Sequence, residues 1–441
     1  MKRLFLHAII MMILFSACNA ASENAPKPDL TPSVFVEELT AAPAATEVPT
    51  PTPPAKIFDL NSMDENNPLC ALDEDQDQFT FSCTQGQITI KESEKRRGMD
   101  IFMARELPAE GEALSLQANV TSIPADPARL DQNQVGFFIS TKSGRRFALR
   151  LQGQFFNFEE WIVENGKEKI IALNQSYAPS MLPAGSSNSI RLVCMTENCD
   201  LLANGTLAGR FPLLDIDNFS SVGYFAASPW DERFGSVTIN NLIIEALPAS
   251  QPEIQAFSLD DGLTADNGTF SKIGLSGAFS DFESDGFHFS PVIPYGYYSA
   301  KAGPALRDVS VSATVEMDFT PGQPATQYGG VMCRGSNEGM VVAVLRVNGT
   351  YTIYRDSELR AFAMLATDIV ESIGEGRSAH RLRLDCIDET IALFIDGNQV
   401  ESLADTRYGV LYGRSGLYTK AGGAAYSDAI IFRDFEINEI R

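Results

Sequence analysis

The sequence predicts an all-β protein with two tandem antiparallel β-sandwich domains, and an internal repeat is the first observation that predicts it. Near the end of each half, a basic-to-apolar strand with a cysteine is followed by an Asn-Gly or Asp-Gly turn, a Gly-aromatic strand and a closing apolar strand. Cys386 follows Cys194 by 192 residues, and Gly416 follows Gly223 by 193 residues. A nearly constant offset indicates two copies of one domain.

The other two observations are the strand periodicity and the turn dipeptides. Asn204-Gly205 and Asp396-Gly397 accept positive φ at both turn centres, so they connect antiparallel strands through two-residue hairpins. The sequence shows no long amphipathic helix, and so many short strands favour two packed sheets over one open sheet. Runs of alternating, β-branched or aromatic residues occur at 114–120, 147–151, 155–163, 309–319, 341–347 and 390–395.

A targeting segment and a tether precede the predicted domains. Residues 1–17 combine a basic start, an apolar stretch and small residues before Cys18, which describes a signal peptide. The apolar stretch is too short for a membrane-spanning helix. Residues 18–56 are rich in Pro, Thr and Ala and are predicted to be an extended, disordered tether. The sandwich domains are predicted at 57–247 and 254–441.

Cys18 is the candidate lipidation site. The segment Phe15-Ser16-Ala17-Cys18 resembles the lipobox of bacterial lipoproteins, with Phe15 where leucine is more usual. The resemblance implies cleavage before Cys18, a diacylglyceryl group on its sulfur, and a place on the bacterial cell membrane facing away from the cytoplasm. The alternative is an ordinary secretory signal in which the cysteine occurs by chance.

Composition argues against one class of partner. The chain has 441 residues, 44% of them hydrophobic, and a formal net charge of −23. An acidic chain is repelled by nucleic-acid phosphates and by anionic lipid surfaces, so we expect no nucleic-acid partner. The length and composition are those of a globular protein with two or three domains.

The remaining cysteines predict disulfides, because an even number of them follows Cys18 in an exported chain. Other pairings stay open, since spacing alone does not fix connectivity. No metal site is expected, because only Cys194 and Cys199 have a short metal-like spacing and no histidine lies nearby. The position that matches Cys333 in the other repeat holds Ile139. Proximity favours the pairs Cys70–Cys83, Cys194–Cys199 and Cys333–Cys386.

The order of these patterns resembles the concanavalin A-like jelly roll. Each copy has a glycine-led strand (136–139 and 330–333), a hairpin pair and a basic strand (189–194 and 380–386), followed by the turn and the Gly-aromatic strand. Bacterial extracellular domains related to laminin-G-like and 3-keto-disaccharide hydrolase-like modules are particularly similar. The resemblance covers nearly all of both domains. It implies the fold and a frequent association with glycans, but no reaction.

Histidine-based catalysis is not expected. Apart from His7 in the signal segment, the chain has His288 and His380. Neither has a Ser or Cys nucleophile motif around it, and no Gly-x-Ser-x-Gly elbow occurs, so we expect no hydrolytic triad. We expect His288 to pack and His380 to occupy a strand edge.

Glu316 and Asp318 are the nearest approach to a carboxylate pair. Laminarinase-type enzymes on the resembled fold carry Glu-x-Asp-x-x-Glu along one strand, and alternation would place both acids on one face. Pro321 stands where the third acid would be, and the equivalent stretch of the first domain, near Ser122, has no acids. The alternative is a solvated strand face.

An acidic cluster at 73–77 lies between Cys70 and Cys83. Calcium prefers several oxygen ligands, but the spacing lacks the glycine and the distal glutamate of a helix-loop-helix calcium loop. We therefore predict no cofactor. Calcium at this cluster is the alternative to a solvated acidic loop.

Aromatic residues are the candidates for ligand binding, because sugar rings stack on Trp and Tyr. Trp161 lies on a predicted hairpin strand, and Trp230 lies in a polar loop after the Gly-aromatic strand. Tyr297 and Tyr298 belong to the densest aromatic cluster of the second domain. The alternative for Trp161 and the tyrosines is the sandwich core. Trp230 is the strongest candidate, because loops carry exposed functional side chains.

The sequence favours a non-catalytic, surface-anchored lipoprotein that binds an extracellular glycan or another exposed ligand. The two copies agree on the scaffold and differ at Cys333, at Glu316 and in the Trp230 loop, whereas a duplicated active site would be expected to match. Two alternatives remain: a carbohydrate-active hydrolase that uses Glu316 and Asp318, and a structural lipoprotein that binds a protein partner.

Overall fold

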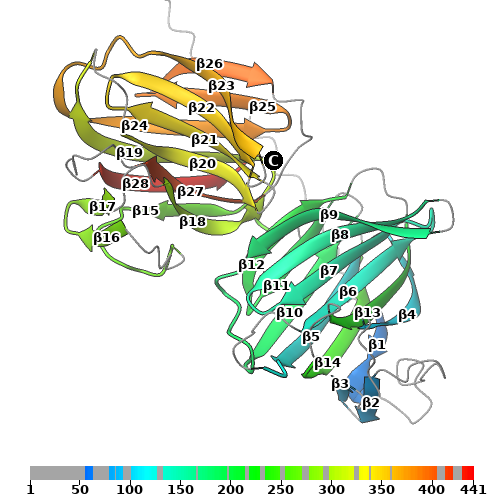
Figure 1. The fold of residues 1–441 in the computed structure, drawn as a ribbon. Helices are drawn as coiled ribbons and strands as arrows, with labels where there is room; N and C mark the ends of the chain where they lie inside the picture. Colours follow the sequence, from blue (N-terminus) through cyan, green and yellow to red (C-terminus); the bar gives the residue numbers. More distant parts are fainter. Residues whose placement is uncertain are drawn as a thin grey trace, which may run out of the picture. The chain divides into compact units, whose positions relative to one another are not determined.

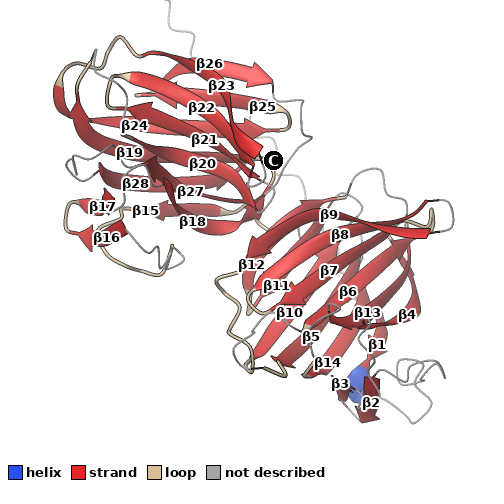
Figure 2. Ribbon diagram, viewed as in Figure 1, coloured by secondary structure: helices blue, strands red, loops and turns tan. Residues whose placement is uncertain are grey.

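In the computed structural model, the described residues are mostly β-strand (Figure 2). The chain divides into the units Met1–Thr50 and Pro51–Arg441, and all described residues belong to the second unit. Among them, no helix is long and apolar enough to cross a membrane. The described residues are 55–62, 79–84, 86–92, 101–126, 133–164, 167–195, 198–213, 218–228, 234–248, 254–270, 278–291, 297–321, 327–336, 339–357, 360–404, 413–420 and 430–441.

In the first half, one layer has the antiparallel strand order β2-β3-β14-β5-β10-β11-β12, with β1 beside β14 (Figure 1). The 3-10 helix η1 (Leu60–Ser62) follows β1 directly. The strands are β1 (Ala55–Asp59), β2 (Phe79–Thr84), β3 (Gln87–Glu92), β5 (Leu114–Ile123), β10 (Ser187–Cys194), β11 (Asn198–Ala203), β12 (Thr206–Pro212) and β14 (Ser236–Ala246).

The second layer of the first half has the antiparallel order β4-β13-β6-β7-β8-β9. Apolar residues of both layers meet in one core, where Leu116, Phe137 and Phe158 are at most 2% exposed. The strands are β4 (Ile101–Gly111), β6 (Gln134–Thr141), β7 (Arg146–Gln152), β8 (Phe155–Glu164), β9 (Lys167–Tyr177) and β13 (Phe219–Ser228).

In the second half, one layer has the order β16-β17-β28-β19-β24-β25-β26, with β15 beside β28. The other has the order β18-β27-β20-β21-β22-β23. The strands are β15 (Ser258–Asp261), β16 (Ala278–Glu283), β17 (Gly286–Pro291), β18 (Tyr297–Leu306), β19 (Val309–Phe319), β20 (Tyr328–Ser336), β21 (Gly339–Arg346), β22 (Thr350–Ser357), β23 (Arg360–Ile369), β24 (Gly376–Ile387), β25 (Thr390–Ile395), β26 (Asn398–Ala404), β27 (Gly413–Lys420) and β28 (Ile430–Glu439).

The repeat found in the sequence is visible in the strand order. The order β14-β5-β10-β11-β12 of the first half matches β28-β19-β24-β25-β26 of the second, and β4-β13-β6-β7-β8-β9 matches β18-β27-β20-β21-β22-β23. A second core lies between the layers of the second half, where Val311, Val331 and Leu384 are fully buried. One parallel register pair, Gly209 with Ala305, links β12 to β18, so these layers count as a single 14-stranded sheet. The predicted all-β sandwich fold is confirmed.

The predicted two-residue turns are also confirmed. Asn204 and Gly205 have φ values of 52° and 82°, and Asp396 and Gly397 have values of 50° and 81°. Positive φ at both centres joins antiparallel strands without splaying them. The side chains repeat the match, because the backbone N–H of Ser189 donates to Asn204 at 2.8 Å and that of Arg381 donates to Asp396 at 2.9 Å.

Two predicted disulfides join described cysteines. Cys194–Cys199 clips the β10–β11 hairpin, and Cys333–Cys386 links β20 to β24, which belong to opposite layers. Ile139 occupies the position of Cys333 in the first half, since Ile139 pairs with Phe147 as Cys333 pairs with Val341. Cys83 is disulfide-bonded. Its predicted partner Cys70 lies outside the described residues.

Candidate functional site

The β4-β13-β6-β7-β8-β9 layer carries a second apolar cluster on the face away from the core. Alternation along β6 sends Phe137 into the core and Phe138 to the opposite face. There Phe138 packs with Ala148, Trp161 and Phe225, which we call the outer cluster. The Trp161 ring centroid lies 6.3 Å from that of Phe138 and 5.5 Å from that of Phe225. Since an outward sheet face is usually polar, this cluster marks a specialised surface.

Gly136 makes room for the outer cluster. A Cβ atom at this position would lie 2.3 Å from the Phe225 ring and 2.3 Å from the carbonyl oxygen of Leu149. Any side chain would therefore displace the ring or the neighbouring strand.

One Arg–Glu pair covers the outer cluster. The Arg146 guanidinium lies 4.7 Å from the Phe138 ring centroid and 5.7 Å from that of Trp161, within cation–π range. It also lies 3.0 Å from the Glu106 carboxylate, which accepts hydrogen bonds from the hydroxyls of Ser140 and Ser221. The side chains of Arg146 and Glu106 are 24% and 42% exposed. This pair is therefore the part of the surface that solvent reaches.

A second Arg–Glu pair lies deeper on the same face. Arg150 contacts Glu159 at 2.9 Å and also donates to Gln134. The same Glu159 oxygen accepts the Trp161 indole N–H at 3.1 Å. The Nε atom of Arg150 is buried without a protein partner, so it is a donor that a bound ligand or a water could use.

This face can bind hydroxyl-rich ligands through its polar groups. Guanidinium groups donate, carboxylates accept, and serine hydroxyls do both, which is the set that a polyhydroxylated ligand needs. Trp161 is only 4% exposed, so its ring supports Arg146 and Glu159 and does not lie open for stacking. The paired charges also hold the carboxylates as acceptors of hydrogen bonds.

The matching face of the second half has tyrosines in place of the outer cluster. By strand register, Tyr418 beside Gly330 takes the place of Phe225 beside Gly136. The Arg346 guanidinium lies 5.7 Å from the Tyr328 ring centroid and 5.6 Å from that of Tyr354. The cluster consists of Tyr328, Met332, Val342, Val344, Tyr354 and Tyr418.

The predicted ligand-binding aromatics are not brought together among the described residues. Trp161 belongs to the outer cluster, while Tyr298 is 5% exposed and packs in the second core against Phe289, with ring centroids 5.0 Å apart. Trp230 and the Tyr297 side chain lie outside the described residues. The acidic cluster at 73–77 lies outside them as well, so its ligand binding stays a prediction.

Glu316 is held between two arginines. It lies on the face of β19 away from the core, where it pairs with Arg377 and Arg433. Burial raises the pKa of Glu316, but the two guanidinium groups outweigh burial and hold this pKa below its usual range. The repeat alignment with Ser122 is off by one residue. Glu316 pairs with Ala379 as Thr121 pairs with Ser187, so Thr121 is its counterpart.

His288 is close to two carboxylates. One ring nitrogen lies 2.6 Å from Asp285 and the other 3.7 Å from Glu283, and these three groups are close enough together to hold a metal ion. Arg433 lies 3.7 Å from Asp285, and its positive charge opposes a bound cation. The arrangement is therefore better suited to hydrogen bonding within the hairpin β16–β17.

His380 lies between a serine hydroxyl and a carboxylate, although no nucleophile motif surrounds it in the sequence. Its Nε2 lies 3.0 Å from the Ser378 hydroxyl, and its Nδ1 lies 2.7 Å from the Asp396 carboxylate. No nucleophile-elbow motif marks these residues. The signal that could have found them is the Ser-x-His spacing on one strand face, combined with the aspartate of the Asp-Gly turn.

Comparisons with known proteins carry no argument about the fold or the ligands of this chain. No protein-family profile matches the chain, and no curated protein matches it. A carbohydrate-binding module from Bacillus subtilis is 12% identical, with 37% of this chain and 92% of that chain covered and a TM-score of 0.29. Domains LG4-5 of the mouse laminin α1 chain are 12% identical, covering 84% and 93%, with a TM-score of 0.24. A GlcNAcα1-4Gal-releasing endo-β-galactosidase from Clostridium perfringens is 7% identical, covering 86% and 96%, with a TM-score of 0.36.

Proposed function

We propose that this protein is a lipid-anchored, extracytoplasmic glycan-binding protein that uses the outer face of β4-β13-β6-β7-β8-β9. The observation that carries the proposal is the layer of two Arg–Glu pairs over the outer cluster. Arg146 and Glu106 are the accessible pair, and Ser140 and Ser221 extend it with hydroxyls. Such a rigid set of donors and acceptors over an apolar floor suits ligands with many hydroxyl groups.

We assign Arg146 and Arg150 a role in glycan binding. Each guanidinium is held in place by a carboxylate and an aromatic ring. Arg150 pairs with Glu159 deeper on this face, and Glu159 is 4% exposed. Hydroxyls of a glycan would bridge Arg146 and Glu106 at the surface and reach the unpartnered Nε of Arg150 only with a shift of the covering side chains.

Affinity electrophoresis of the full chain through gels with neutral and acidic polysaccharides tests the proposal. We expect retention by at least one polysaccharide, and a loss of about tenfold in affinity for Arg146→Ala, which corresponds to about 1.4 kcal/mol. Arg383→Ala is the matched control, because Arg383 also stacks on a ring, Phe394, but on the other layer of the second half. Folded protein that no polysaccharide retains, or equal retention of Arg146→Ala, would contradict the proposal.

The anchor is tested separately. Cys18→Ala should move the protein from the membrane fraction to the soluble exported fraction and abolish incorporation of labelled fatty acid. Unchanged membrane association of this variant would show that the cysteine is not the anchor.

A further inference from the structure

We propose that Ser378, His380 and Asp396 form a nucleophilic site that hydrolyses small carboxylic esters. The Ser378 hydroxyl is 3.0 Å from His380 Nε2, and His380 Nδ1 is 2.7 Å from an Asp396 oxygen. This is the order of nucleophile, general base and orienting carboxylate that acyl-transfer sites use, recognised by geometry and not by position in the sequence. The inference does not rest on the proposed glycan binding.

The local structure fixes all three side chains. Ser378 and His380 are two residues apart on β24, so alternation puts them on one face. Asp396 opens the Asp-Gly turn, where its N–H donates to the Arg381 carbonyl at 2.8 Å. One Asp396 oxygen accepts the Arg381 N–H at 2.9 Å, which leaves the other oxygen for the imidazole. The turn that closes the hairpin therefore also aims the carboxylate.

The partners determine the imidazole tautomer. An ionised carboxylate only accepts hydrogen bonds, so Nδ1 of His380 carries the proton that points to Asp396. Nε2 then presents its lone pair to the Ser378 O–H. This is the tautomer that can accept the hydroxyl proton when the oxygen attacks.

The surroundings combine an apolar wall with an open side. The Phe319 ring lies edge-on to the imidazole, with ring centroids 5.3 Å apart. Val315 and Met317, the strand partners of His380 and Ser378, are at most 2% exposed. Asp396 is 42% exposed and Ser378 is half-buried, so a small acyl group can reach the hydroxyl while the wall restricts the imidazole.

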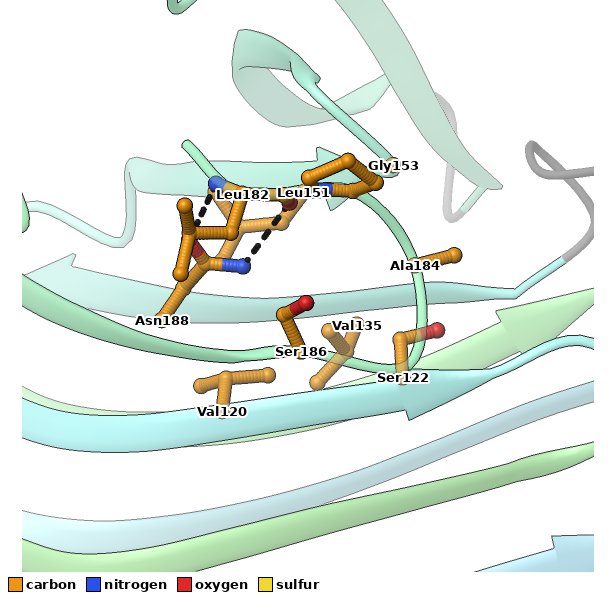
Figure 3. A pocket seen from close by; sticks show the side chains of 10 residues that line it. Val120, Ser122, Val135, Leu151, Gly153, Leu182, Ala184, Ser186 and Asn188 are labelled. Atoms are coloured by element: carbon orange, nitrogen blue, oxygen red, sulfur yellow. Dashed lines mark hydrogen bonds between the residues drawn. The ribbon is translucent and has the colours of Figure 1, made fainter. Parts of the chain in front are cut away.

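The first half holds the same frame without the acid–base chemistry. Ser186, Asn188 and Asn204 stand 192 residues before Ser378, His380 and Asp396. Asn188 accepts the Leu182 N–H at 2.7 Å and donates to the Leu182 carbonyl at 3.2 Å (Figure 3). Asn188 also accepts a hydrogen bond from the Asn204 amide at 2.9 Å. An amide cannot take up the proton of a hydroxyl at neutral pH.

The first half shows that this part of the fold does not need a histidine and an aspartate. Ser186 and Asn188 line a cavity of about 20 Å³, about the size of one water, at the end of the first sandwich (Figure 3). Amides are sufficient for the turn and for the end of the sandwich in that copy. The second copy therefore has a base and a carboxylate that its fold does not require.

The reaction balances with water as the only co-reactant. The Ser378 oxygen forms a bond to the ester carbonyl carbon, and its proton passes to His380 Nε2. The carbon–oxygen bond to the alcohol then breaks, and the leaving oxygen takes the proton from Nε2, which leaves an acyl-serine. A water molecule attacks this acyl group with His380 again as base, releasing the carboxylic acid and restoring the Ser378 hydroxyl.

The test uses the full chain with p-nitrophenyl acetate as substrate and a fluorophosphonate as covalent probe. We expect the probe on Ser378, located by peptide mass spectrometry, and hydrolysis that falls at least about 100-fold in Ser378→Ala or His380→Asn. Ser186→Ala is the matched control in the first half and should change neither readout.

Asp396→Asn tests the positioning role of the carboxylate. Asparagine keeps the turn, as Asn204 does, but its N–H₂ would donate to Nδ1 and reverse the tautomer. We expect kcat to fall at least about 100-fold with KM and the thermal midpoint unchanged. An unlabelled Ser378 together with turnover no faster than that of Ser378→Ala would overturn the inference. So would an Asp396→Asn variant with full activity.

Discussion

The two sandwiches of this chain are one scaffold with two sets of side chains. Their layers share the same strand orders, and their turns share positive φ at Asn204 and Asp396. Yet Asn188 faces Asn204 where His380 faces Asp396, and charged pairs cover the first outer face where tyrosines fill the second. Turn geometry and strand register are therefore the same in both halves, whereas the side chains on the sheet faces and at the sandwich ends differ.

The largest effect is expected from the disulfide that only the second sandwich has. Cys333–Cys386 closes a separation of 53 residues, against 5 for Cys194–Cys199. Loop entropy predicts a loss in unfolding free energy of about 4 kcal/mol for Cys333→Ala with Cys386→Ala, and about 2 kcal/mol for Cys194→Ala with Cys199→Ala. Urea unfolding of both double variants measures the difference.

Two spectroscopic signals distinguish the unfolding of the first half from that of the second half. Both tryptophans, Trp161 and Trp230, lie in the first half, so tryptophan fluorescence follows that half while circular dichroism follows both. Loss of Cys333–Cys386 should shift the dichroism curve and leave the fluorescence curve in place. Equal losses for the two double variants would contradict the entropic explanation.

Exchanging the turn residues should have a smaller and unequal effect. The Asn204 amide donates to the Ser180 carbonyl at 2.6 Å and to Asn188 at 2.9 Å. Asn204→Asp removes both donors and sets a carboxylate against two acceptors, so we expect a loss of about 2 kcal/mol. Asp396→Asn keeps an acceptor for the Arg381 N–H and should cost less than about 0.5 kcal/mol. Thermal unfolding measures the loss of stability in each variant. Equal losses would show that the hydrogen bonds around Asn204 and Asp396 contribute equally to the two turns.

The scaffold could be predicted from the sequence because its signals are local. Turn dipeptides predict positive φ, and alternating runs predict which face of a strand is buried. The pairs Cys194–Cys199 and Cys333–Cys386 follow from proximity in the sequence. The contact of His380 with Asp396 is harder to predict, because it depends on the register of the hairpin that brings these two residues together in the folded chain. Trp161 is a candidate from the sequence, but its contacts with Phe138 and Phe225 could not be predicted for the same reason, since the three residues come from three strands that alternation alone does not align.

The last difference between the halves concerns Glu316, whose counterpart Thr121 has no charge. Arg377 and Arg433 lower the pKa of Glu316 in the folded chain, so its contribution is present above the unfolded value of about 4.3 and is lost as the pH falls through the folded value. Glu316→Gln should cost about 1 kcal/mol at pH 7, since partial exposure screens the pairs. The difference between the variant and the native chain should close on acidification.

Urea unfolding at a series of pH values from 7 to 2 measures that difference. Asp318→Asn, an exposed acid two residues along the same strand, is the matched control and should follow the native curve closely. A gap that keeps its full size at pH 2 would mean that Glu316 contributes through packing and not through its charge. In that case the contrast with Thr121 is one of shape, and the two strands β5 and β19 differ less electrostatically than their sequences suggest.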